Sequence, residues 1–103
     1  MNNFFDFNYL NDLSNKFGDS FYIFDSNRFK NNYFEFLNSF RKYYKKTQIA
    51  YSYKTNYTPY ICKLVNQFGG LAEVVSDMEY DLAIKIGVDP TNIIVNGPYK
   101  TID

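Results

Sequence analysis

Three short β-prone runs separated by two single helical segments constrain the fold of this chain more than any other feature. The runs lie at residues 48–54, 71–75 and 93–96. A single helix between two strands returns the chain to the same end of the sheet, so such strands lie parallel and are joined by right-handed crossovers. The sequence therefore predicts an α/β fold in which parallel strands alternate with helices.

Residues that start and stop helices mark the two helical segments of this unit. Thr58 and Pro59 are typical of an N-cap followed by a first-turn proline. Ser76 and Glu79 form a capping-box pattern at the start of the second helix. Glycines follow both segments, as expected at helix carboxyl ends. The alternation of strand and helix is thus supported by local signals as well as by hydrophobic pattern.

The residue pattern before this unit predicts three elements. They are a short amphipathic helix over residues 8–17, a strand over residues 21–24 and a long helix that begins after Asp25 or Ser26. Aromatic and aliphatic side chains recur along the long helix at helical spacing. They are Phe29, Tyr33, Phe36, Leu37, Phe40, Tyr43 and Tyr44. One strand and one long helix should therefore precede the parallel unit.

The first run of the parallel unit contains one lysine, Lys54. Side chains alternate along a strand, so Lys54 shares a face with the small residues Ala50 and Ser52, and the bulky residues occupy the other face. This arrangement leaves space for a cofactor beside the amine, and the end of a buried strand should partly desolvate it, as a nucleophilic lysine requires. Lys54 is the leading candidate for a catalytic residue, although a lysine at a strand end is more often only a solvated charge.

Composition excludes several classes of protein. The chain has no histidine, so it cannot form a Ser-His-Asp or Cys-His site, and it lacks the commonest metal ligand. Eleven basic and eleven acidic residues cancel, so no overall field attracts nucleic acid or an anionic membrane. Cys62 is the only cysteine, and no apolar run is long enough to span a bilayer. We expect a cytoplasmic protein with no nucleic-acid or membrane partner.

Residues 41–46, with the sequence RKYYKK, form a local exception to this charge balance. Basic and aromatic side chains together can bind nucleic acid. The simpler interpretation is that the charges offset the dipole at the carboxyl end of the long helix, while Tyr43 and Tyr44 fall on its buried face.

Several spaced motifs resemble the amino-terminal region of the fold type III pyridoxal-phosphate decarboxylases, the family that includes diaminopimelate, ornithine and arginine decarboxylases. The resemblance covers residues 21–101, nearly the whole chain. Its motifs are YSYKTN at residues 51–56, AEVVS at residues 72–76 followed by Glu79, and NGP at residues 96–98. Ser52 stands where this family usually has alanine or proline.

The resemblance implies that Lys54 forms the Schiff base with pyridoxal 5'-phosphate at the carboxyl end of the first strand of a TIM-like (β/α) barrel. It also implies that Glu73 is the acidic residue beside the lysine in the cofactor site. Two plainer interpretations stay open: Glu73 could be an outward-facing surface acid, and Glu79 could be simply the capping-box acid.

The resemblance further implies a division into residues 1–25 and residues 26–103. The first part, a helix and a strand, would pair with a carboxyl-terminal β domain that this chain does not contain. The second part would supply the first β/α units of a truncated, partial TIM-like barrel. Other cofactor-binding residues of the family lie further along, so we expect the chain to be inactive alone. Action on an amino-acid substrate would need the missing carboxyl-terminal part of the enzyme or a homodimer partner.

Two alternative functions remain open. The chain could be a stand-alone, non-catalytic small α/β module that binds a partner through an exposed sheet edge. It could also belong to a racemase of the same broad fold, although the residues after Lys54 resemble the decarboxylase branch more closely.

Overall fold

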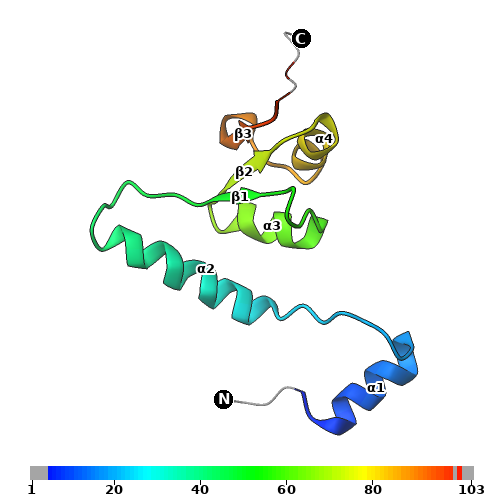
Figure 1. Cartoon of the computed structure of the whole chain (residues 1–103). Coiled ribbons are helices and arrows are strands. Elements are labelled where there is room, and N and C mark those ends of the chain that lie inside the picture. The colour runs from blue at the N-terminus through cyan, green and yellow to red at the C-terminus, as the bar shows by residue number, and fades with distance from the viewer. Residues whose placement is uncertain (1–4, 99, 101–103) are drawn as a thin grey trace. The chain divides into compact units, whose positions relative to one another are not determined.

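The structure is a computed structural model that describes residues 5–98 and 100. It divides into two compact units, Met1–Tyr33 and Phe34–Asp103. The elements follow one another along the chain as labelled in Figure 1: α1 (Phe7–Phe17), α2 (Ser26–Arg41), β1 (Ala50–Ser52), α3 (Pro59–Gln67), β2 (Leu71–Val74), α4 (Asp77–Lys85), the short 3-10 helix η1 (Pro90–Asn92) and β3 (Ile93–Val95).

The helices α1 and α2 begin at capping residues that the sequence makes available. Asp6 caps α1, because its carboxylate accepts a hydrogen bond from Tyr9 N at 2.8 Å. Asp25 caps α2 in the same way through Arg28 N at 2.9 Å. α1 is followed by Gly18, whose φ of 92° is a conformation that suits glycine. Both helices are confirmed, and each begins within a residue of the predicted position.

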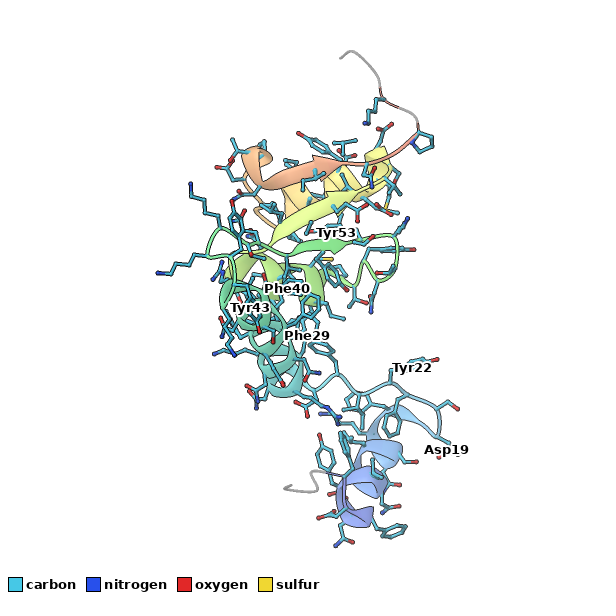
Figure 2. All side chains as sticks on the ribbon, turned by 60° about the vertical axis from the view of Figure 1, so that its left-hand side comes forward. Asp19, Tyr22, Phe29, Phe40, Tyr43 and Tyr53 are labelled. Atoms are coloured by element: carbon cyan, nitrogen blue, oxygen red, sulfur yellow. The ribbon has the colours of Figure 1, made fainter. Side chains whose placement is uncertain are left out.

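The segment at residues 21–24 is not a strand in the described part of the chain, and this prediction is wrong for the chain by itself. A β-prone sequence becomes a strand only when a neighbour supplies ladder hydrogen bonds. The segment is instead irregular, and Tyr22 projects fully into solvent (Figure 2). Its pairing with a second domain stays a prediction.

The RKYYKK segment also differs from the prediction. α2 ends at Arg41, so Tyr43 and Tyr44 no longer follow the helical period that buries Leu37. Arg41 Nε donates to Thr47 O at 3.0 Å, and Thr47 Oγ1 donates to Tyr44 O at 2.6 Å, which folds the segment into turns. The side chains of Tyr43 and Tyr44 are 84% and 63% exposed. The expectation that they fall on a buried face is therefore wrong.

The second unit contains a three-stranded parallel sheet in the order β1-β2-β3. The α/β class and the alternation of parallel strands with helices are confirmed (Figure 1). A sheet of this kind is compatible with part of a (β/α) barrel, which needs eight strands to close. The register aligns Ser52 with Glu73 and Glu73 with Ile94.

The core of this unit lies between one face of the sheet and the two helices α3 and α4. It contains buried side chains from β2, from both helices and from the loops that follow β1 and α4: Tyr53, Cys62, Ala72, Val74, Ala83 and Val88. Because side chains alternate along a strand, the residues between these lie on the opposite side of the sheet. That side, called here the second face, carries Ala50, Ser52, Leu71, Glu73 and Ile94.

Three titratable groups in or against the core should make the fold less stable at alkaline pH. Burial raises the pKa of the Cys62 thiol and of the Tyr51 and Tyr53 hydroxyls above their ordinary values of 9.0 and 10.0. The unfolded chain therefore releases these protons at lower pH than the folded chain, so the free energy of unfolding falls as pH rises through this range. We expect the urea midpoint of the chain to decrease steadily between about pH 8 and about pH 11.

A Cys62→Ala variant provides the control for this dependence. It removes one of the three groups, so its urea midpoint should decline less steeply over the same range. A midpoint that stays constant with pH in the unchanged chain would contradict the assignment of these groups to the core.

Candidate functional site

Lys54 lies in a turn directly after β1. Thr55 N and Thr55 Oγ1 both donate to Ser52 O, at 3.3 and 2.7 Å, and close a turn in which Lys54 is the third residue. Tyr53 N donates to Glu73 O at 3.0 Å, so the sheet ladder reaches the residue before the lysine. Lys54 is thereby fixed at the carboxyl end of β1, the position predicted from the sequence.

The side chain of Lys54 is exposed. The expectation that the end of a strand would partly desolvate the amine is therefore wrong for the described chain. The reason is local: β1 ends at Ser52, and the lysine follows in a turn rather than within a covered strand. Desolvation of this amine would need further protein or a ligand over it.

Glu73 occupies the middle of β2 on the second face and is half-buried. Its neighbours in the sheet register are Ser52 on β1 and Ile94 on β3. Asn96 Nδ2 donates a hydrogen bond to Glu73 Oε1 at 3.2 Å. Glu73 thus lies on the face opposite the core, next to Ser52, and its carboxylate is bonded to the residue that follows β3.

Asn96, the first residue of the NGP motif, is a polar residue at this edge to which the sequence analysis assigned no role in the site. It lies just after β3, where Asn96 N donates to Val74 O at 2.8 Å and extends the ladder by one residue. The available signal was its spacing, because Asn96 follows Ile94 by two positions and therefore shares its face.

The chain passes very close to the end of β2 directly after Asn96. A Cβ atom placed at Gly97 would overlap the backbone of Val75. Glycine is the residue that allows this approach, because it has no side chain to displace. The close approach fixes the backbone from which the Asn96 amide reaches Glu73.

Ser52 contributes a buried hydroxyl to the second face. Its Oγ atom is inaccessible to solvent and has no hydrogen-bond partner among the described residues. A buried hydroxyl without a partner carries a free-energy penalty, so it is a position where a ligand atom or further protein could bind. Ser52 lies two residues before Lys54 and beside Glu73 in the register.

Glu79 is part of the helix start and not of this edge. Ser76 Oγ accepts a hydrogen bond from Glu79 N at 3.3 Å, and Glu79 Oε2 accepts one from Val75 N at 2.8 Å. The side chain is only 4% exposed. The capping-box spacing is confirmed in part: Ser76 caps the helix through Glu79 N, whereas the Glu79 carboxylate bonds to Val75 N, one residue before the N-cap, in place of Ser76 N.

A shallow hollow lies beside the lysine turn and is lined by residues 55–59.

Among residues 5–98 and 100, no cluster of cysteine and carboxylate side chains is arranged to hold a metal ion. Within the same described residues, no helix has the length and apolar character needed to cross a membrane. The structure brings Ser52, Glu73 and Asn96 together on the second face, and Lys54 lies in the turn that follows β1 at the same end of the sheet.

A comparison of the sequence with known protein families agrees with this parallel sheet and the lysine at its carboxyl edge. Residues 32–103 match the family described as "Pyridoxal-dependent decarboxylase, pyridoxal binding domain". The chain therefore belongs to this family, and the resemblance noted in the sequence is confirmed.

Three curated relatives are diaminopimelate decarboxylases. The protein from Aquifex aeolicus is 35% identical over 92 residues, covering 89% of this chain and 21% of the relative. The protein from Methanocaldococcus jannaschii is 32% identical over 94 residues, which cover 87% of this chain and 22% of the relative. The protein from Methanothermobacter thermautotrophicus is 27% identical over 86 residues, which cover 84% of this chain and 20% of the relative. The chain thus spans about a fifth of the length of these relatives. No solved structure matches it.

The residues at the carboxyl edge fit the pyridoxal group that the family binds. An accessible amine is needed for attachment, and Lys54 provides one. The second face beside it carries only small side chains on β1, and the Ser52 hydroxyl has no hydrogen-bond partner among the described residues. The fit covers the attachment end of the cofactor, since the described residues contain no glycine-rich loop for its phosphate.

Proposed function

We propose that this chain is the amino-terminal portion of a pyridoxal-phosphate-dependent amino-acid decarboxylase, similar to diaminopimelate decarboxylase, and that Lys54 is the residue to which the cofactor attaches. One observation supports this most directly. The chain belongs to the pyridoxal-binding family, and the turn after β1 holds Lys54 at the carboxyl end of the sheet. The preceding residue, Tyr53, donates its backbone N–H to Glu73 O on β2. Active sites of parallel α/β folds lie at this end of their strands.

Each residue at this edge has a distinct role in the proposed site. Pyridoxal phosphate, when bound, supplies an electron sink for the charge left when a carboxylate departs as carbon dioxide. The Lys54 amine would hold the aldehyde end of the cofactor. The Glu73 carboxylate would stabilise the protonated form of a nearby amine, that of Lys54 or of the substrate, because opposite charges in close contact favour the protonated form.

The proposed domain organisation rests on the same assignment. Residues 26–103 would supply the first β/α units of the barrel, and residues 1–25 would pair with a carboxyl-terminal β domain. Three parallel strands leave one face and two edges incompletely covered, so catalysis would need the rest of an enzyme or a second subunit to exclude water. We therefore expect the 103-residue chain to be inactive by itself.

The attachment residue can be tested by reduction. Pyridoxal phosphate is added to a chimera in which this chain replaces the matching segment of the Aquifex aeolicus relative, so that the rest of the proposed site is present. The adduct is fixed with borohydride, and peptides are mapped by mass spectrometry. Lys54 should carry the label in preference to Lys63, an exposed lysine on α3 that serves as an internal control. Equal labelling of the two lysines would overturn the proposal.

A non-catalytic interaction module is the second candidate. The observation that favours it is the apolar edge strand β3, where Ile94 and Val95 are 41% and 43% exposed. Exposed strand edges pair readily with other chains. Such a module would give no preference for Lys54 in the labelling experiment, which separates the two candidates.

A further inference from the structure

The hydrogen bond between Asn96 and Glu73 joins two strands at the point where the site is built. It connects residues that are 23 positions apart in the sequence, and both side chains project on the second face. The amide of Asn96 occupies Oε1 of the carboxylate at 3.2 Å. The orientation of the Glu73 carboxylate therefore depends on where β3 ends.

Two backbone features fix the position of that amide. Asn96 N is bonded to Val74 O at 2.8 Å, and the next residue, Gly97, lies against the backbone of Val75. The Asn96 amide is thus held on a rigid strand end and not on a free loop. A donor held in this way can orient its acceptor with little loss of entropy on ligand binding.

The arrangement leaves the second carboxylate oxygen of Glu73 for another donor. Tyr53 N is bonded to Glu73 O, so the residue next to Lys54 is attached to the residue that carries the carboxylate. The Ser52 hydroxyl lies beside Glu73 in the register and has no partner among the described residues. An oriented carboxylate and an unpaired hydroxyl therefore lie side by side on the second face, and Lys54 follows two residues after the hydroxyl in the chain.

We propose that Asn96 is a positioning residue, which orients the Glu73 carboxylate toward the nitrogen that attaches the cofactor at Lys54. This inference rests on the function proposed above. Asn96 itself does not touch the cofactor in this scheme, and it acts by keeping Oε1 occupied. Oε2 is then directed at the positive charge of the attachment nitrogen.

The experiment has two independent readouts, the first on the full 103-residue chain and the second on the chimera with the Aquifex aeolicus relative. The first is the side-chain carbonyl carbon signal of Glu73 in a ¹³C-labelled sample without cofactor. The second is the ratio of borohydride-fixed label on Lys54 to that on Lys63 at a subsaturating concentration of pyridoxal phosphate. Asn96→Ala should shift the carbon signal and lower the labelling ratio by about three- to tenfold, since it removes a hydrogen bond to a charged group that is only partly buried.

A double-mutant cycle separates positioning from a general loss of structure. Glu73→Gln should lower the ratio by a similar factor, and Asn96→Ala added to Glu73→Gln should lower it no further, because the residues act as one unit. Asn92→Ala is the matched control: this exposed asparagine precedes β3, and its replacement should leave both readouts unchanged.

The possible results distinguish the two proposals. Absence of preferential label on Lys54 in the unchanged chimera overturns the proposed function, and the inference with it. Two other results would overturn the role of Asn96 alone. In the first, Lys54 is labelled preferentially but Asn96→Ala changes the labelling ratio by less than twofold. In the second, Asn96→Ala lowers the ratio as much in the Glu73→Gln background as in the unchanged protein.

Discussion

Replacing Lys54 by methionine is expected to remove the borohydride-fixed label from the site peptide completely. Methionine keeps an unbranched side chain of similar length and eliminates the amine, and the exposed position tolerates the change. In a chimera in which this chain replaces the matching segment of the Aquifex aeolicus relative, kcat/KM for diaminopimelate should fall by on the order of a thousandfold or more, since the attachment residue acts in every turnover.

Lys63→Met is the matched control for this substitution. Lys63 is an exposed lysine on α3, so its loss should change neither the labelling of Lys54 nor the activity of the chimera. The free energy of unfolding of both variants should stay within about 0.5 kcal/mol of the unchanged chain, because neither side chain is buried. A Lys54→Met chimera that keeps most of its activity would remove Lys54 from the mechanism.

Much of the parallel unit could be predicted because its signals are local. Pro59 starts α3, Ser76 caps α4, and Gly87 follows α4 with a φ of 91°, as expected of a helix-terminating glycine. Between these points the hydrophobic runs leave little choice but parallel strands. The capping role of Glu79 is explained by the same local spacing.

The predictions that failed depend on where an element ends or on which groups cover it. The segment at residues 21–24 has the composition of a strand but no ladder partner among the described residues. α2 ends at Arg41, before the period that would have placed Tyr44 beside Leu37. Hydrophobic period describes a face only while the helix continues, so an earlier helix end changes the burial of the residues beyond it.

The candidate site was predictable in its residues along β1 and β2 but not in their geometry. Alternation placed Ser52 and Lys54 on one face, whereas the turn that fixes Lys54 depends on Thr55 bonding back to Ser52 O. The bond from Asn96 to Glu73 requires the register of β2 and β3, and a shift of one residue would place these side chains on opposite faces. Register is a property of the assembled sheet, which explains why the NGP motif alone did not show that Asn96 bonds to Glu73.

The second large effect is expected at Tyr53, the residue that connects the core to the site. Its side chain is 1% exposed and packs in the core cluster with Cys62 and Val74. Tyr53→Ala removes a large buried ring and leaves a cavity, which should lower the free energy of unfolding by about 3–5 kcal/mol. Urea unfolding followed by circular dichroism measures this change as a shift in midpoint.

Two further tyrosine variants show whether the ring or the hydroxyl is responsible. Tyr53→Phe keeps the ring and loses only the buried hydroxyl, so it should cost about 1 kcal/mol and retain the label on Lys54. Tyr57→Ala removes a ring that is 51% exposed and should change stability by about 0.5 kcal/mol or less. If Tyr53→Ala were no more destabilised than Tyr57→Ala, the packing of β1 against the helices would be incorrect. Lys54 would then lose its fixed place at the strand end, because that place depends on Tyr53 being anchored in the core.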